Sequence, residues 1–481
     1  MFQPAERLAI FFTYANEFLS LSNQDYLYPI SQGGSIIVQA THQEFIDLSI
    51  NDPLSLLNLQ REEIRTDPYP FYEQLRNQDP VHWDEEMGFW VLTRYSDIES
   101  LYTDERFSRA QGLMRGFQRL SDSDRQIAAP VYHSFSKTVF YADPPYHTHL
   151  RGLMNHAFTP RRVERLRAPI QRIVDELLDN AQSRNGMDVL QDLAYPLPVM
   201  VIAELLGLPA QDRERFKKWS DDLFAILGTV RPKSHDLLER AAQSLEEMTG
   251  YVKDLSLERQ EHPQDDLLTA LLSATDEDGI ASSDEPGSHP FHSMEAQLYT
   301  HEAAATLTRE ELVANVNILL STGHETTTHL IGNGLLALLQ NPDQMQQLKT
   351  EPALLSKAIE EILRYDNPVQ ITYRSATDDA ELRGRQIRKG DLVNTIIGSA
   401  NRDPERFSDP DRFDIFRSEG RHLGFGVGIH FCIGAPLVRL EAEIVFESIL
   451  RRFPRLALAT EKLEWQEHPI FRGLKSLPVH L

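Results

Sequence analysis

The sequence has almost no cysteine, no long apolar run and too few positive charges to balance its acidic residues. Cys432 is the single cysteine among 481 residues, which excludes an intramolecular disulfide and any zinc or iron–sulfur site built from several thiolates. No stretch reaches the roughly 18 to 20 consecutive apolar residues that cross a bilayer. The N-terminus also lacks the basic segment and small-residue cleavage site of a signal peptide. These absences predict a cytoplasmic protein without a membrane span.

The net charge is −24, so the protein lacks the basic footprint that general nucleic-acid binding requires. Such an acidic excess favours solubility and says little about the fold. The single thiol has two readings that composition cannot separate. It is either a small buried hydrophobic side chain or a reactive group such as a nucleophile or an axial metal ligand.

Hydrophobic periodicity divides the chain into a short N-terminal segment and a long, mainly helical remainder. Residues 1–51 carry no recognisable motif and are expected to be an extension of unknown role. Two apolar runs, 81–83 and 89–95, flank an acidic turn with glycine and predict a β-hairpin. Apolar residues at helical spacing predict helices over 161–184, 188–207, 210–228, 234–262 and 265–274.

A long irregular insert and the longest helix follow. Residues 275–306 are rich in Asp, Ser, Gly and Pro, which predicts an insert without regular structure. A helix is expected over 308–340, since Thr308 with Glu311 three residues later forms a capping box. Short strands follow residue 367. The expected fold class is mainly α with a small β portion, as one domain over residues 52–481.

The sequence around the cysteine is rich in glycine and precedes a helix. Phe425-Gly-Val-Gly-Ile-His-Phe-Cys-Ile-Gly434 lets the backbone turn tightly and approach a large flat ligand. A helix N-terminus and backbone N–H groups stabilise a thiolate, so Cys432 is a candidate axial iron ligand. An incidental buried cysteine in a glycine-rich turn is the plain alternative. A dinucleotide loop is disfavoured because the third glycine is missing.

The segment Thr322-Gly-His-Glu-Thr-Thr-Thr328 breaks helix preference inside the longest helix. A threonine hydroxyl can bond the carbonyl four residues back and bend a helix, which would open a groove beside Thr326. Glu325 next to it can relay protons. A zinc protease helix is disfavoured, because His324 and His329 are five residues apart and therefore project in different directions.

Two further motifs carry arginine at helical spacing. His147 and Arg151 are four residues apart at the start of a helix and can face one anionic group; a capped surface helix is the alternative. Glu361 and Arg364 share a helix face and can pair. That spacing alone means little, since Glu164 and Arg167 repeat it on what is expected to be a solvated surface.

Taken together and in this order, these motifs resemble those of the cytochrome P450 family, in its soluble bacterial form. The family's haem signature matches Phe425, Gly428, His430, Cys432 and Gly434, and the acid–alcohol pair of its oxygen helix matches Glu325 and Thr326. Thr322 replaces the alanine or glycine that is usual there. Further matches extend the resemblance over roughly residues 52 to 481.

The resemblance implies the P450 fold and assigns the site residues. Cys432 would be the proximal ligand of haem b (iron protoporphyrin IX), and Glu325 and Thr326 would be catalytic, delivering protons. His430, Arg374, His147 and Arg151 would bind the haem propionates. Glu361 and Arg364 would be structural, with Arg402 or Arg406 completing their network.

The implied activity is a monooxygenase reaction that inserts one atom of O2 into a lipophilic small molecule, by hydroxylation or epoxidation, in natural-product tailoring or in lipid or terpenoid oxidation. Electrons would come from NAD(P)H through a ferredoxin and its reductase, docking near Arg161, Arg162 and Arg439 on a monomer. Substrate would contact residues 107–142, 210–240, 318–323, 369–373 and 470–474. Two alternatives stay open: a P450-fold peroxygenase, isomerase or dehydratase, and a haem-binding protein without turnover.

Overall fold

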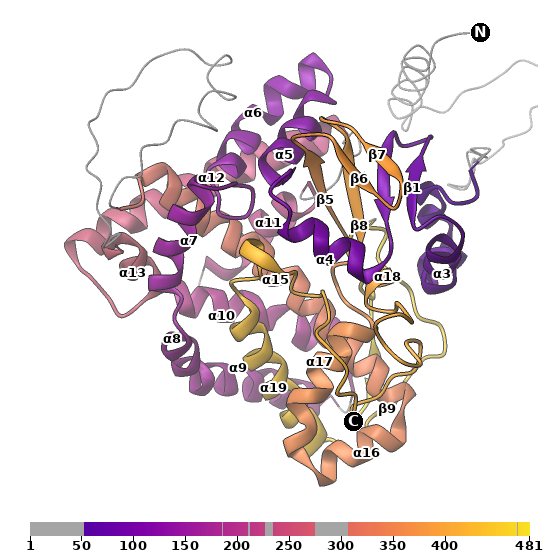
Figure 1. The fold of residues 1–481 in the computed structure, drawn as a ribbon. Coiled ribbons are helices and arrows are strands. Elements are labelled where there is room, and N and C mark those ends of the chain that lie inside the picture. Colours follow the sequence, from indigo (N-terminus) through magenta and orange to yellow (C-terminus); the bar gives the residue numbers. More distant parts are fainter. Residues whose placement is uncertain (1–51, 185, 210–211, 227–233, 275–305, 469) are drawn as a thin grey trace, which may run out of the picture. The chain divides into compact units, whose positions relative to one another are not determined.

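A computed structural model describes residues 52–481, apart from 185, 210–211, 227–233, 275–305 and 469. The expected N-terminal extension over 1–51 and nearly all of the expected insert over 275–306 lie outside the described residues. The described part is mainly helical with a small β portion, which confirms the expected fold class (Figure 1).

Helices make up most of the described chain. In chain order they are η1 (Leu56–Gln60), α2 (Glu62–Thr66), α3 (Tyr69–Gln78), α4 (Tyr95–Thr103), α5 (Arg109–Gln118), α6 (Asp122–Ser136), α7 (Tyr146–Ala157), α8 (Pro160–Arg165), α9 (Arg167–Ser183), η2 (Leu190–Ala194), α10 (Pro196–Leu206), α11 (Arg213–Phe224), α12 (His235–Glu261), α13 (Leu267–Ser273), α15 (Arg309–Gln340), α16 (Pro342–Thr350), η4 (Pro352–Leu354), α17 (Leu355–Tyr365), α18 (Ile397–Ala400), η5 (Gly428–His430) and α19 (Ala435–Arg452).

The strands form three small sheets. They are β1 (Val81–Asp84), β2 (Phe89–Leu92), β3 (Phe107–Ser108), β4 (Met187–Asp188), β5 (Ile371–Ala376), β6 (Ala380–Leu382), β7 (Arg385–Ile387), β8 (Leu392–Ile396), β9 (Ala457–Leu458) and β10 (Pro478–His480). The largest sheet has the order β1-β2-β8-β5-β3, and the others are β4-β10-β9 and β6-β7.

The expected hairpin is confirmed and forms one edge of the largest sheet. Trp83 of β1 faces Trp90 of β2 in an antiparallel register, and the two indole rings pack edge to face. The next pairing, β2 with β8, is parallel, whereas β8 with β5 and β5 with β3 are antiparallel. The sheet carries Arg374 on β5, one of the residues expected in the site.

Prolines break two of the expected helices. The single helix expected over 161–184 is divided into α8 and α9, and Pro169 stands in the first turn of α9. Proline has no N–H to continue a helix, so it is tolerated in a first turn and disfavoured further inside. The helix expected over 188–207 begins as β4 and η2 and becomes α-helical only at Pro196.

The longest helix, α15, lies at the centre of the helical part. Its N-cap is Thr308, and the Thr308–Glu311 capping box is present, as the sequence predicts. Figure 1 shows α15 among the other helices, and α10, α11, α12, α17 and α19 all pack against it. Because it is covered on most sides, it is buried along nearly its whole length rather than along one stripe.

No membrane span is found among the described helices, since none of them joins the necessary length to the necessary hydropathy.

Candidate functional site

A cavity among the described residues lies between α15 and the loop that carries Cys432. On the α15 side its wall is formed by Thr322, Gly323 and Thr326, and on the opposite side by the segment from Gly424 to Leu437. A third side of the cavity is formed by residues of β5 and the segment just before it, which are Val369, Ile371, Thr372, Tyr373 and Arg374. The helix and the glycine-rich loop that the sequence singles out therefore face one space, although about a hundred residues separate them.

The loop turns tightly before the cysteine. Gly426 and Gly428 have positive φ angles of 70° and 74°, a region that favours glycine. A Cβ at Gly428 would lie only 3.0 Å from the carbonyl oxygen of Tyr102, so a side chain would also be too close to α4. The N–H of Cys432 donates to the carbonyl of Phe425 at 2.9 Å and closes the turn.

The thiol of Cys432 stands at the start of α19 and lines the cavity. Burial raises its pKa, while N–H groups of Gly434 and Ala435 and the guanidinium of Arg151 act in the opposite direction and favour the thiolate. A positively charged metal at the sulfur would add the attraction needed to deprotonate it. The arrangement suits a thiolate ligand whose proton leaves when a cation binds.

Positive charge gathers on one side of the cavity. Arg109 at the start of α5, Arg151 of α7 and Arg374 of β5 line it together with His430 of the cysteine loop. The His147 and His430 rings are in contact, with centroids 4.4 Å apart and their planes tilted by 58°. Burial lowers the pKa of Arg374 to about 9 and that of His147 to about 4, and it lowers the pKa of His430 further still. Both imidazoles are thus neutral hydrogen-bonding groups at neutral pH.

This positive side fits the two propionates of a haem. The backbone N–H of Arg109 donates to Asp143 at 3.0 Å, and the charge of this carboxylate also acts on Arg374. One carboxylate therefore offsets only part of the charge of the three arginines, and the positive remainder suits anionic propionates. Nε2 of the buried His147 has no hydrogen-bond partner among the described residues. Buried polar groups rarely stay unpaired, which also indicates a ligand.

Sequence reasoning missed Arg109. It is 7% exposed, and its guanidinium carbon lies 4.1 Å from the centroid of the Phe140 ring, at the cavity wall. Nothing near it in the sequence has the spacing of a motif. Its place beside Arg374 results from the pairing of β3 with β5, which joins residues 107–108 to 375–376.

The α15 side of the cavity is built from threonines, as the sequence predicts. The hydroxyl of Thr326 donates to the carbonyl of Thr322 at 2.9 Å, four residues back. Thr322 and Thr327 do the same to Ile318 and Gly323, at 2.7 and 3.1 Å. These bonds occupy the hydroxyl protons and leave oxygen lone pairs of Thr322 and Thr326 at the cavity wall.

Glu325 points away from the cavity toward α11. Its Oε2 lies 3.4 Å from Nε2 of the buried His329, and Asp221 of α11 is close enough to act on it electrostatically. Burial, followed by the charge of Asp221, raises the pKa of Glu325 to about 7, while Lys217 acts weakly against this shift. A carboxyl with that pKa exchanges protons readily near neutral pH.

The Glu361–Arg364 pair lies beside the cavity region and is fully buried. Nε and Nη2 of Arg364 donate to the two oxygens of Glu361 at 2.7 and 2.8 Å. Nη1 of Arg364 donates to the carbonyl of Asn401 at 2.9 Å, which ties α17 to the segment after α18. This geometry supports a structural role.

The expectation that Arg402 or Arg406 completes this network is wrong. The third member is Arg417, whose Nε lies 3.2 Å from Glu361 Oε2. Arg402 instead donates to the carbonyl of Tyr365 and stacks 3.4 Å above the ring centroid of Tyr69. Arg406 lies over the ring of Tyr95. The chain after residue 407 folds back on α17 and brings Arg417 close, which spacing could not reveal.

His324 and His329 do not converge, in agreement with their spacing. His324 meets Asp221 of α11, and His329 meets Glu325 one turn back along α15. The sequence singled out both histidines but gave no signal for Asp221, which is more than a hundred positions from His324.

Comparisons with known proteins agree with this geometry. A family model described as Cytochrome P450 matches residues 117–471. The chain is 39% identical to the cytochrome P450 monooxygenase PikC of Streptomyces venezuelae, over 89% of this chain and 94% of that protein. It is 36% identical to the polyketide biosynthesis cytochrome P450 PksS of Bacillus subtilis, over 87% and 97%.

Solved structures show the same fold. A crystal structure of P450BioI, in complex with an acyl carrier protein ligated to hexadec-9Z-enoic acid, superposes with a TM-score of 0.75 at 34% identity. The match covers 87% of this chain and 99% of that one.

Proposed function

The chain belongs to the cytochrome P450 family and is a monooxygenase that uses haem, dioxygen and electrons from a redox partner; on that premise we propose that it oxidises a lipophilic natural product, with Cys432 holding the haem iron. The observation that carries the proposal is the position of Cys432 in a nest of N–H groups at the wall of a cavity. Thr326 lines the same cavity from α15.

Haem b would be held by the cysteine loop and by the arginine and histidine side chains of the positive wall. Cys432 would bind the iron. The loop from Phe425 to Gly434, which turns tightly at Gly428, would lie against the flat macrocycle. His147, Arg151, Arg374 and His430 would bind the propionates, and we add Arg109 to this group because it shares their wall. A thiolate-ligated haem, when bound, supplies an electron-rich iron at which dioxygen is activated and cleaved.

Proton delivery falls to Glu325 and Thr326. The Thr326 hydroxyl donates to Thr322 and so presents its oxygen to the cavity as a hydrogen-bond acceptor, for a water proton for example. Glu325 lies one residue away, on the side of α15 nearer to Asp221, whose side chain is 39% exposed. With a pKa of about 7 it takes up and releases a proton at little cost, as a relay requires.

The electrons are proposed to come from NAD(P)H through a ferredoxin and its reductase. Of the arginines proposed for docking, Arg161 is exposed, whereas Arg162 donates to the carbonyl of Asp266 and Arg439 donates to Glu360 at 2.7 Å. Arg161 is therefore the member with most freedom to meet an acidic partner. We further propose a cytoplasmic monomer in which residues 52–481 form the catalytic domain and residues 1–51 an extension.

The substrate is proposed to be a medium or large apolar molecule, such as a polyketide, a terpenoid or a fatty-acid derivative. The cavity wall away from the arginines is formed by apolar side chains, which are Ile202, Leu205, Phe224, Ile318, Ile470 and Phe471. The helix α10 contributes the first two, and it lies outside the segments expected to contact substrate. Relatives that act in polyketide biosynthesis or hold a carrier-bound fatty acid support this class.

The first test is the absorption spectrum of the dithionite-reduced, CO-bound protein, compared with a Cys432→Ala variant. A strongly red-shifted Soret band in the parent, absent from the variant, is the expected result for thiolate ligation. A band typical of histidine ligation, or the same spectrum in both proteins, would overturn the assignment of Cys432. Product formed from NAD(P)H and O2 with surrogate redox partners would then separate a monooxygenase from a peroxygenase, an isomerase or a sensor.

A further inference from the structure

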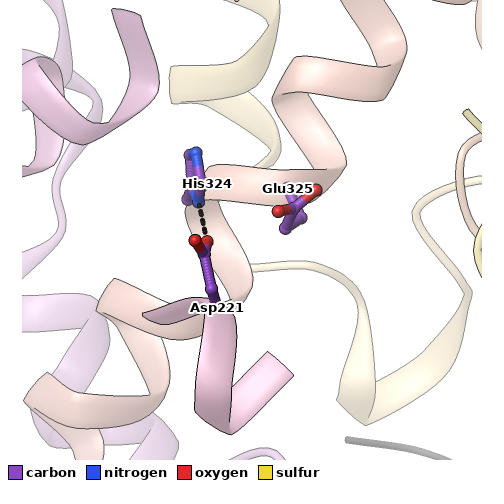
Figure 2. Close-up of side chains that lie close together, drawn as sticks. All are labelled: Asp221, His324 and Glu325. Carbon is purple, nitrogen blue, oxygen red and sulfur yellow. Dashed lines mark ion pairs between the residues drawn. The ribbon is translucent and has the colours of Figure 1, made fainter. Parts of the chain in front are cut away.

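A second group of ligand-type side chains lies behind α15, on the side away from the cavity. Asp221 of α11 and the adjacent His324 and Glu325 of α15 each place a nitrogen or oxygen ligand atom within 4.8 Å of the others (Figure 2). The carboxylate of Asp221 points at the His324 ring, and Nδ1 of the ring is 3.8 Å from Oδ1 of Asp221.

The histidine is the part of this group that needs an explanation. His324 is 1% exposed, and neither of its ring nitrogens has a hydrogen-bond partner among the described residues, beyond a weak interaction with the backbone of Tyr195. The 3.8 Å separation from Asp221 is too long for a hydrogen bond. A buried imidazole without a partner is costly, so something absent from the chain itself is expected to satisfy it.

A metal ion fits between the ligand atoms of Asp221, His324 and Glu325. Zinc binds nitrogen and carboxylate oxygen at roughly 2.0 to 2.2 Å in tetrahedral geometry, which separates neighbouring ligand atoms by about 3.4 Å. Asp221 and His324 are within a small rotation of that separation, and Glu325 lies close enough to supply a third ligand. One imidazole with two carboxylates suits zinc better than magnesium or calcium, which prefer oxygen alone.

The surroundings supply supporting contacts of the kind that metal ligands have. The hydroxyl of Tyr195 donates to Asp221 Oδ1 at 2.6 Å, and the Tyr195 ring packs edge-on against His324 with centroids 4.4 Å apart. His329 holds the other carboxylate, that of Glu325. Such contacts orient ligands and commonly affect metal affinity by about 10- to 100-fold. The side chain of Asp221 is 39% exposed, so an ion can reach the group from solvent.

We propose that Asp221, His324 and Glu325 form a binding site for one zinc ion, and that the bound ion withdraws Glu325 from proton delivery. The second half rests on the proposed function, since it takes Glu325 as the proton relay beside Thr326. Zinc is then an inhibitor that acts from behind the helix and leaves the haem in place. The positive charge of Lys217 acts on Asp221 and on Glu325 and partly opposes the burial that raises the pKa of each carboxyl. The same charge would repel a bound cation, so Lys217→Met should tighten zinc binding.

The test measures zinc binding to the haem-loaded full chain by equilibrium dialysis and metal analysis. The parent should bind one ion tightly, and Asp221→Asn and His324→Gln should each weaken that ion by at least roughly tenfold. Asp222→Asn is the matched control, because Asp222 is the next residue of α11 but binds Lys218 and Ser244 instead. Equal binding by all four proteins, or no tight ion in the parent, would overturn the site and leave water as its occupant.

A milder variant shows whether weaker zinc binding has a cause other than misfolding. Tyr195→Phe removes only the hydroxyl that holds Asp221 and should weaken zinc by about 10- to 100-fold. The reduced CO spectrum of each variant shows whether its haem site is intact. The parent's spectrum also separates the two proposals, because absence of the thiolate band from the parent would refute the proposed function, whereas zinc binding could still be measured.

The regulatory half has its own readout. Zinc at saturating concentration should slow product formation by the parent at unchanged haem content, and it should not slow Asp221→Asn. If zinc binds tightly and the parent's rate and its coupling to NAD(P)H oxidation stay the same, Glu325 is not withdrawn and that half is wrong.

Discussion

Two buried glutamates among the described residues, Glu361 and Glu325, differ in how completely their carboxylates are paired. Glu361 accepts from Arg364 at 2.7 and 2.8 Å, from the N–H of Asp414 at 2.8 Å and from Arg417 at 3.2 Å. Glu325 has one close partner, His329, at 3.4 Å. Both carboxylates are largely removed from water, at 2% and 17% side-chain exposure.

This difference in pairing distinguishes a structural carboxylate from one that can take part in proton transfer. A buried charge with every lone pair satisfied is locked in one state and holds segments together. A buried carboxyl with few partners has its pKa moved toward neutrality and changes its protonation easily. The cluster around Glu361 joins α17 to the chain beyond α18, whereas the cluster around Glu325 lies on α15 on the side away from the cavity, one residue from the cavity-lining Thr326.

The largest effect is expected from breaking the paired cluster. Glu361→Ala leaves the buried guanidinium of Arg364 without a carboxylate, while Arg417 keeps its ion pair with Glu419, and the loss at Arg364 should destabilise the fold by about 3 to 5 kcal/mol. Urea unfolding monitored by circular dichroism measures this loss. The matched control is Glu164→Ala, because Glu164 and Arg167 have the same spacing but are 62% and 42% exposed. The control should cost less than about 1 kcal/mol; equal losses would show that burial does not decide the role of this motif.

The next effect is on catalysis. Glu325→Gln removes the proton of the relay and keeps its shape, so product formation should fall by on the order of 100-fold. The parent's rate should also fall as the pH rises above about 7, where Glu325 becomes charged, and the variant should lose that dependence. Product assays from pH 6 to 9 with surrogate redox partners measure both. An unchanged rate in the variant would remove Glu325 from the mechanism.

The same substitution should have the opposite effect on stability. The folded-state pKa of about 7 lies above the ordinary 4.5, so the neutral carboxyl favours the fold at low pH and this contribution is lost as the pH rises through 7. The loss amounts to at most about 3 kcal/mol. Glu325→Gln should therefore match the parent at pH 4.5 and exceed it at pH 8 in urea unfolding. A parent that is equally stable relative to the variant at both values would contradict the raised pKa.

The smallest effect concerns the residue that confines His329. A Cβ at Gly473 would lie 1.9 Å from Nδ1 of His329, so Gly473→Ala must displace the ring that contacts Glu325. We expect a loss of about 1 to 3 kcal/mol and poorer coupling of NAD(P)H oxidation to product. Gly250→Ala is the control, because it is exposed in α12 with nothing within 4 Å, and alanine there should be neutral or slightly stabilising. Loss of stability with normal coupling would show that His329 does not position Glu325.

Local pattern predicted those parts of the fold that depend on neighbouring residues. The hairpin of β1 and β2, the Thr308 capping box and the back-bonded threonines of α15 are all interactions over a few positions, and all were predicted correctly. Helix ends were predicted less well where proline intervened, because apolar spacing continues through Pro169 and Pro196 although the helix does not.

The sequence by itself determined the family, the mainly helical fold and the residues proposed for the site, because glycine, threonine and cysteine at fixed short spacings leave few alternatives. Only the tertiary structure decided that Arg417 rather than Arg402 pairs with Glu361, that Arg109 joins the cationic wall, and that Asp221 meets His324. Each of these contacts joins residues tens to hundreds of positions apart. Their partners are chosen by how helices and strands pack, and that choice leaves no periodic mark in the sequence.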